Sequence, residues 1–165
     1  MNDYVAYTLE STKCIGLKVI NAGGSEFFKN GGEVFNLDDV VPSYGVSSRE
    51  ILKTLNIANE ELKIKHPLHV HCNNLGVPGN IKTILETIKT AEGRRMHLAH
   101  VHFYGYDNKG KKGFSSGSLD LAEAVNTNKN ITVDVGQVMF KPTLTISSDV
   151  LRQFGARNNA NPKKW

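Results

Sequence analysis

The sequence lacks most of the features that mark out special classes of protein. Its two cysteines, Cys14 and Cys72, are too few and too far apart for a disulfide framework or a four-thiolate zinc site. No stretch is apolar over the roughly 20 residues that a membrane helix needs, and the first ten residues lack the regions of an export signal. These absences predict a cytoplasmic protein that is neither exported nor embedded in a membrane.

Several common catalytic motifs are also missing. The sequence has no GxSxG elbow, HExxH helix, phosphate-binding glycine loop or CxxC pair. A net charge of +4 and a pI near 9.0 would suit a nucleic-acid surface, but the basic residues are scattered, with small groups only at 109–112 and 163–164. We therefore expect no nucleic-acid partner, and keep a basic binding module without catalysis as an alternative.

The order of apolar residues predicts a parallel α/β fold. Short β-branched runs alternate with segments in which apolar residues recur every three or four positions. The expected strands are residues 14–20, 67–72, 96–103 and 131–136. Such strand–helix–strand units occur in doubly wound sheets and in (β/α)8 barrels, and their periodicity does not separate the two.

Three helices are expected between these strands. The first begins with a capping box of Ser47 and Glu50. Asn80 is a suitable N-cap for the second, and Gly93 a suitable left-handed stop. Ser118 is expected to cap the third. A complete barrel takes about 250 residues, so this chain would hold about half of one.

Histidines are concentrated in two of the expected strands. All six lie between positions 66 and 102, and the strand residues are His69 and His71 in one strand and His97, His100 and His102 in the next. Side chains alternate along a strand, so each strand directs two imidazoles to one face. Because neutral imidazole is a common ligand of zinc, the pattern favours a metal site, although a single strand histidine more often makes an ordinary hydrogen bond.

Lys18 is the unusual charge among apolar neighbours. It lies between Leu17 and Val19, where an ammonium group is costly to bury unless it is paired or neutralised. A neutral amine there could add CO2, and the resulting carbamate could bridge two metal ions. The alternative is a lysine that extends to solvent from an edge strand.

Amides and a carboxylate follow two of the strands. The loop NNLGVPGN, residues 73–80, would either contact a polar substrate through Asn73 or shape a tight turn. Asp134 and Gln137 flank Gly136 at the end of the last strand. We expect Asp134 to be either a ligand of metal or substrate, or a hydrogen-bond partner of the backbone.

Four segments together resemble the catalytic polypeptide, the A subunit, of formylmethanofuran dehydrogenase. They are GLKVINAGG (16–24), HPLHVHCNNLGVPGN (66–80), MHLAHVHFYGY (96–106) and ITVDVGQVMFKPTLT (131–145). The resemblance covers nearly the whole chain and extends to the corresponding polypeptide of formyltransferase/hydrolase complexes. The long motifs HVHCNNLGVPGN and DVGQVMF are far more specific than a lone HxH.

The resemblance implies a fold and a metal centre. The fold is a partial (β/α)8 TIM-like barrel of the metal-dependent amidohydrolase type, with residues 1–165 as the central part of a single domain, roughly strands four to seven. The centre is two divalent metal ions, usually zinc, held by a carboxylated Lys18, His71 and His100, which are also the catalytic residues. The remaining ligands of the family, an HxH pair and an aspartate, fall outside this chain.

The resemblance leaves some assignments open. His69 is the alternative to His71, and Lys13 competes with Lys18. Substrate contacts or support for the ligands are expected from His69, Asn73, His102 and Gln137. His102 stands where relatives commonly have glutamine, and Ala22 where proline is expected.

The implied activity concerns the N-formyl bond of formylmethanofuran. The chain would form this bond from formate and the amine of methanofuran, or hydrolyse it, together with the other subunits of a dehydrogenase or formyltransferase/hydrolase complex. The sequence does not fix the direction, and the chain alone is expected to be inactive. Another metal-dependent cyclic amidohydrolase, of the dihydroorotase kind, is the enzymatic alternative.

Overall fold

A four-stranded parallel sheet forms the centre of the chain. The computed structural model describes residues 1–29, 34–110 and 113–135. The sheet strands are β1 (Lys18–Ile20), β4 (Leu68–His71), β5 (Met96–Leu98) and β8 (Ile131–Val133), in the order β1-β4-β5-β8. Two antiparallel pairs lie in the connections, β2 (Val40–Val41) with β3 (Val46–Ser47) and β6 (Tyr106–Asp107) with β7 (Ser115–Ser116). The predicted parallel α/β architecture is confirmed.

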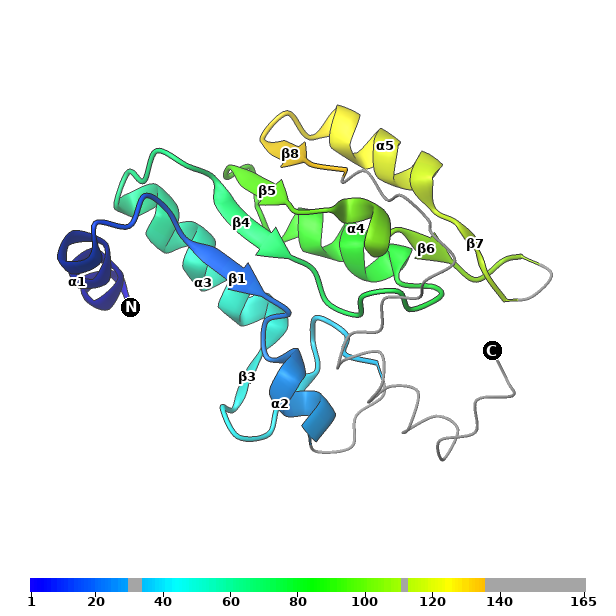
Figure 1. The fold of residues 1–165 in the computed structure, drawn as a ribbon, viewed down its shortest axis with the longest axis horizontal. Helices are drawn as coiled ribbons and strands as arrows, with labels where there is room; N and C mark the ends of the chain where they lie inside the picture. The colour runs from blue at the N-terminus through cyan, green and yellow to red at the C-terminus, as the bar shows by residue number, and fades with distance from the viewer. Residues whose placement is uncertain (30–33, 111–112, 136–165) are drawn as a thin grey trace, which may run out of the picture.

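Helices cover one face of this sheet. The helices are α1 (Asn2–Thr12), α2 (Gly24–Lys29), α3 (Ser48–Glu61), α4 (Ile81–Lys89) and α5 (Ser118–Thr127), with a short 3-10 helix η1 (Val101–Phe103). Figure 1 shows α3 and α4 behind the sheet and α5 beside β8. Leu68, Val70 and Leu98 are fully buried against Ile84 in one core. Because strand side chains alternate, the residues between them must face the opposite side.

The start of α3 follows the sequence prediction. The Ser47 hydroxyl accepts a hydrogen bond from the Glu50 backbone at 3.2 Å, and the Glu50 carboxylate accepts one from the Ser47 backbone at 2.7 Å. The Ser47 backbone N–H and hydroxyl both donate to the Glu50 carboxylate and hold the pKa of Glu50 below its usual value. The capping box satisfies two backbone N–H donors at the N-terminal end of α3.

The other helix ends match the predictions only in part. Asn80 occupies the N-cap of α4, but its side chain makes no cap hydrogen bond. Gly93 has a positive φ of 82°, yet α4 ends before it at Lys89. Gly117, rather than Ser118, is the N-cap of α5. The Asn80 amide instead donates to the carbonyls of Asn73 and Tyr104, which a local sequence pattern does not reveal.

The strand expected at 96–103 is wrong beyond Leu98. His100 has φ 33° and ψ 52°, in the left-handed region, and residues 101–103 form η1. This turn buries both Val101 and Tyr104 in the core. Residues three apart face opposite sides of a strand but the same side of a helical turn. His100 and His102 therefore do not share a strand face.

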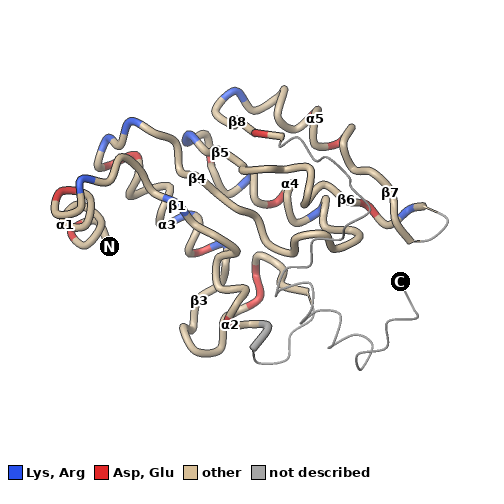
Figure 2. The backbone as a smooth tube through the Cα atoms, in the orientation of Figure 1, with Lys and Arg blue, Asp and Glu red and all other residues tan. Residues whose placement is uncertain are grey.

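The distribution of charge and the length of the helices concern two possible partners, nucleic acid and membrane. Lys and Arg are spread over helices and loops with Asp and Glu among them (Figure 2). Among the residues that the structure describes, no helix is both long and apolar enough to cross a bilayer.

A parallel sheet in this strand order is compatible with part of a barrel and with an open sheet, so the barrel stays a prediction.

Candidate functional site

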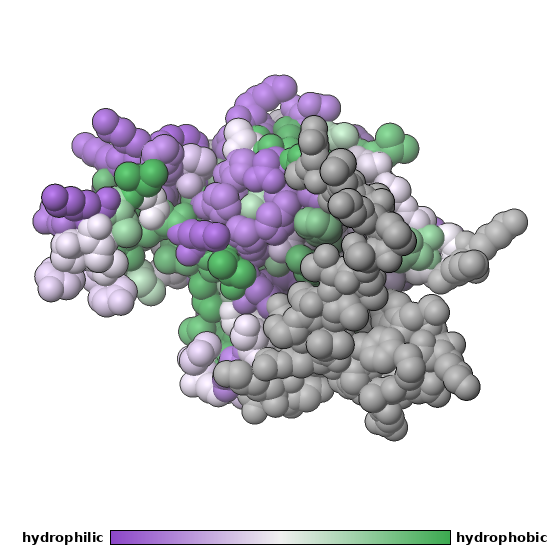
Figure 3. All heavy atoms as spheres, viewed as in Figure 1, coloured by the Kyte–Doolittle hydropathy of each residue, from purple (hydrophilic) through white to green (hydrophobic). Residues whose placement is uncertain are grey.

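The face of the sheet opposite α3 and α4 is polar. Lys18, His69, His97 and Thr132 form one row across the four strands. His71 lies one row nearer the C-terminal ends, beside Ile20. Figure 3 views this face and shows hydrophilic residues gathered at its centre, over β4 and β5. Alternation along the strands thus places the imidazoles of β4 and β5 on one surface.

Four imidazoles on this face form a chain of contacts. The ring centroids of His97 and His69 are 5.1 Å apart, those of His69 and His71 5.1 Å, and those of His71 and His100 4.3 Å. His100 reaches the cluster from the turn after β5 rather than from a strand. The structure therefore brings together His69, His71 and His100, as the sequence predicts, although by a different local geometry.

The cluster fits the chemistry of a metal ligand set. The Nε2 atoms of His69 and His71 lie 3.2 Å apart, within hydrogen-bond distance, so that one ring can support the other. The Nδ1 atom of His100 is buried with no hydrogen-bond partner among the described residues. In the described ranges no three His, Cys, Asp or Glu side chains meet as a complete metal site. The cluster can thus supply part of a ligand set.

Burial keeps the imidazoles of His69 and His71 neutral. Desolvation, followed by the neighbouring His100 and Lys18, lowers the pKa of His71 to about 4. Desolvation is also the largest cause of the lowered pKa of His69, with His97 next. At neutral pH both rings are therefore unprotonated, which is the form that binds a metal ion.

These lowered pKa values predict a pH dependence of stability. The folded pKa of His71 is about 4 and its ordinary value is 6.5, so the unfolded state binds more protons between these values. We expect the free energy of unfolding of the metal-free subunit to fall by up to about 1.4 kcal/mol per pH unit for such a histidine as the pH drops through this window. Urea unfolding at successive pH values measures it.

A His71→Gln variant provides the control for this prediction. Its stability should decline less steeply than that of the parent between pH 6.5 and about 4, because the titrating group is gone. Parallel curves for the two proteins over this window would contradict the assignment of a buried neutral imidazole.

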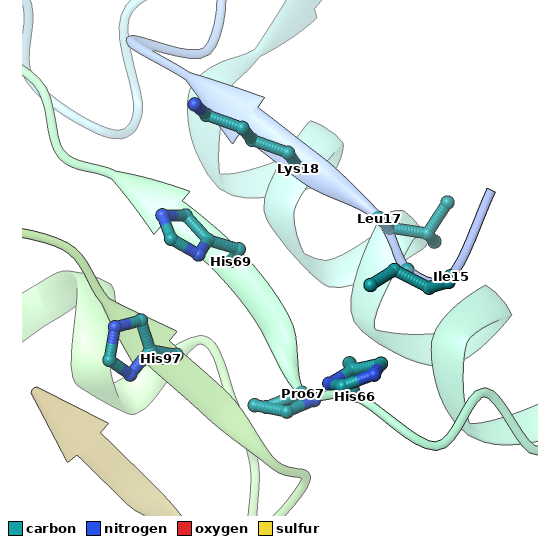
Figure 4. Close-up of a pocket in the computed structure, with 8 residues that line it drawn as sticks. Ile15, Leu17, Lys18, His66, Pro67, His69 and His97 are labelled. Atoms are coloured by element: carbon teal, nitrogen blue, oxygen red, sulfur yellow. The ribbon is translucent and has the colours of Figure 1, made fainter.

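Lys18 lies on the same face but is not buried. Lys18 is exposed on β1, an edge strand of the described sheet, which agrees with the alternative of a lysine that extends to solvent and not with burial among apolar neighbours. The reason is alternation: Val19 packs against the core, so Lys18 points to the other face. Figure 4 shows its side chain extending along β1 toward the C-terminal end of the strand. Lys13 instead caps the end of α1 with φ 55°.

A cavity adjoins the cluster on the side of the strand beginnings. It has a volume of about 420 Å³ and is lined by Lys18, His69, His97 and the residues that precede β1 and β4 (Figure 4). Lys18 and His69 thus line the cavity and also belong to the row of the polar face that lies next to the row of His71.

Three buried asparagines hold the loops beside the cluster together. Asn74 accepts a hydrogen bond from the Phe35 backbone N–H at 2.9 Å and donates one to its carbonyl at 3.0 Å. Asn80 donates to the carbonyls of Asn73 and Tyr104. These bonds join the segment before β2 to the loops that follow β4 and β5. Sequence reasoning assigned Asn80 to a cap and missed this network, because amide pairing between distant loops leaves no local pattern.

The side chain of Asn73 belongs to the same network. Asn73 is 3% exposed and donates to the Ser48 hydroxyl at 3.0 Å. Of the two roles expected for it, substrate contact or support, this geometry favours support.

Removing the Asn74 side chain should destabilise the protein. An Asn74→Ala variant leaves the Phe35 N–H and carbonyl without their partners in a buried setting, which costs about 1–3 kcal/mol per group. We expect a loss of about 2–4 kcal/mol in the free energy of unfolding of the complete subunit. Asn126→Ala, on an exposed position of α5, is the matched control and should change stability by less than about 0.5 kcal/mol. Equal effects of the two variants would contradict the network.

Of the remaining predicted residues, Asp134 contacts the cluster, His102 lies in the turn beside it and Gln137 lies outside the described chain. His102 lies in η1, with its ring centroid 4.0 Å from that of Phe103 and both ring nitrogens buried without a described partner. Burial lowers its pKa. Gln137 lies outside the described residues. Asp134 makes the backbone hydrogen bond that was one of its two expected roles, to the N–H of His100 at 2.6 Å.

Comparison with known proteins gives two curated relatives. The chain is 48% identical over 170 residues to the A subunit of the formyltransferase/hydrolase complex Fhc of Methylorubrum extorquens, covering all of this chain and 31% of that protein. It is 36% identical over 173 residues to Protein FwdA of Methanocaldococcus jannaschii, covering 98% of this chain and 30% of that protein. The chain thus spans about a third of the length of these relatives. The sequence matches no protein-family model.

A solved structure of a formyltransferase/hydrolase complex is also similar to this chain. A chain of the formyltransferase/hydrolase complex FhcABCD from Methylorubrum extorquens, determined with methylofuran, superposes with a TM-score of 0.83 at 49% identity. The match covers 99% of this chain and 30% of that chain. The resemblance inferred from the four sequence motifs is therefore confirmed.

Proposed function

The chain is a homologue of one segment of FwdA and of its counterpart in the Fhc formyltransferase/hydrolase complex, and on that premise we propose that it acts on the N-formyl bond of a formylated furan carrier. The observation that carries the proposal is the 49% identity over 99% of the chain with a protein whose complex was determined with methylofuran. The carrier would be methanofuran or a close analogue such as methylofuran. The segment would work within the complete polypeptide, together with the other subunits of its complex.

We propose Lys18, His71 and His100 as the residues that hold two divalent metal ions, with zinc the expected metal. His71 is preferred to His69 because it lies nearer the C-terminal ends of the strands and its ring is 4.3 Å from that of His100. His69, whose Nε2 is 3.2 Å from that of His71, is assigned to support. The orphaned Nδ1 of His100 and the neutral state of His71 support this ligand set.

The residues of this chain would prepare the site for amide hydrolysis. When bound, the ions would polarise the formyl carbonyl and lower the pKa of a water molecule. His71 would present an unprotonated nitrogen from the end of β4, and His100 a ring nitrogen from the turn after β5. The Lys18 amine would form an N–C bond to CO2 and release a proton, which gives an anion at the end of a side chain that extends toward the C-terminal end of β1.

We propose the hydrolytic direction for this chain. Its identity to the relative from the formyltransferase/hydrolase complex, 48%, exceeds its identity to FwdA, 36%. In hydrolysis the oxygen of water joins the formyl carbon, the C–N bond breaks, the amine takes up a proton and formate leaves. The reverse reaction would use the same groups.

Activity measurements on the complete subunit, in complex with its partners, test this function. Formate release from a formylated furan carrier is expected, and no turnover of dihydroorotate. Turnover of dihydroorotate alone would replace the proposal with the cyclic amidohydrolase alternative. Absence of both activities, together with a salt-dependent affinity for RNA, would favour the basic binding module.

A further inference from the structure

The His100 backbone adopts an unfavourable conformation. With φ 33° and ψ 52° it lies in the left-handed region, which residues other than glycine enter at a cost of about 1–2 kcal/mol. The turn is held by backbone hydrogen bonds from Val101 N–H to the Asp134 carbonyl at 3.1 Å and from Asp134 N–H to the Leu98 carbonyl at 3.2 Å. These bonds flank His100 but do not engage its own N–H.

The carboxylate of Asp134 completes the turn. Its Oδ1 accepts a hydrogen bond from the His100 N–H at 2.6 Å, and its Oδ2 lies 3.0 Å from Nε2 of His97. His97 is fixed in turn by Thr132, whose hydroxyl is 2.9 Å from Nδ1. The side chain of Asp134, just after β8, thus ties the His100 backbone to an imidazole on β5.

The His100 ring has contacts that depend on this backbone geometry. It packs edge-on against His71, with centroids 4.3 Å apart, and stacks on Tyr104 at 5.7 Å with an interplanar angle of 20°. Relaxation of φ to a negative value would swing the Cα–Cβ bond away from His71. The hydrogen bond to Asp134 therefore bears on where the ring points.

We propose that Asp134 is a positioning residue, which holds His100 in its left-handed conformation and so directs the His100 imidazole toward His71. The proposal rests on the function proposed above, because the consequence of positioning is the metal affinity of the His71 and His100 pair. Partners that orient a metal ligand typically contribute about 10–100-fold in affinity.

Three variants of the complete subunit test the proposal. Asp134→Ala removes both acceptors, whereas Asp134→Asn retains an oxygen for the His100 N–H and loses the charge. Thr132→Val is the matched control, because it loses the contact to His97 Nδ1 but leaves the bond to His100. The readouts are cobalt(II) affinity, the visible spectrum of the bound cobalt, and hydrogen exchange of the metal-free protein over residues 99–104.

Asp134→Ala should lower cobalt affinity about 10–100-fold, shift the spectrum and speed exchange over residues 99–104. Asp134→Asn should largely restore all three, and Thr132→Val should leave them unchanged. Parent-like affinity, spectrum and exchange in Asp134→Ala would overturn the proposal, as would equal losses in Asp134→Ala and Asp134→Asn. Failure of Asp134→Ala and of a second variant, Asp134→Ser, to fold would overturn it too and assign the residue a structural role instead. If the parent subunit bound no cobalt at His71 and His100, the proposed metal site would fail independently of these comparisons.

Discussion

Replacing His71 by alanine in the complete subunit is expected to reduce formyl hydrolysis by about a thousandfold and to strip bound metal. A single supporting partner of a metal ligand is worth about 10–100-fold, so loss of the ligand itself should cost more. His71 combines a lowered pKa of about 4, which keeps its nitrogen available, with a ring 4.3 Å from that of His100. Plasma-emission analysis and steady-state rates measure the two effects.

His66→Ala is the matched control for this experiment. His66 is exposed and precedes β4, away from the contact with His100. Its replacement should leave metal content and the rate within about twofold of the parent, the range expected of a surface substitution. Full metal content in the His71→Ala subunit would exclude His71 as a ligand, and the same measurement on His69→Ala would show whether its neighbour takes that role.

Replacing Lys18 by alanine should have the second largest effect. Two divalent ions about 3.5–4 Å apart repel strongly, and neutral imidazoles do not offset that charge. A carbamate on Lys18 would provide a bridging anion, so Lys18→Ala should lower both metal content and activity by about a hundredfold or more. Acetate or propionate should restore part of both by filling the vacated position, and Lys18→Glu should retain a fraction.

Lys13→Ala distinguishes the two lysines. Lys13 is the C-cap of α1, in a left-handed conformation with φ 55°, and lies outside the polar face of the sheet. Its loss should affect stability slightly and leave metal content unchanged. Acid rescue of Lys13→Ala rather than Lys18→Ala would reverse the assignment, and an unmodified Lys18 turned to solvent in the metal-loaded subunit would refute the carbamate.

The sequence predicts the sheet and the shared face of His69 and His71 because both follow from simple periodicity. Alternation puts His69 and His71 on one face wherever β4 forms, and the buried Leu68 and Val70 decide which face that is. The capping box of α3 is predictable as well, because it depends only on residues that are close in the sequence. The family resemblance rested on long motifs, and the comparisons confirm it.

The turn after β5 could not be predicted from the sequence in the same way. His100 and His102 fit a strand pattern, yet burial of Val101 and Tyr104 on one side requires a helical turn. That preference depends on tertiary packing and on Asp134, which is 34 residues from His100. The exposure of Lys18 and the pairing of Asn74 with Phe35 likewise depend on which surfaces neighbouring segments cover.

Anomalous X-ray scattering from crystals of the complete metal-loaded subunit would locate the metal ions. We expect two metal peaks at the C-terminal ends of β1, β4 and β5, with nitrogens of His71 and His100 at about 2.0–2.1 Å from a peak and a carboxylated Lys18 between the two. Metal bound elsewhere, with His71 and His100 free of it, would exclude these residues as the ligands.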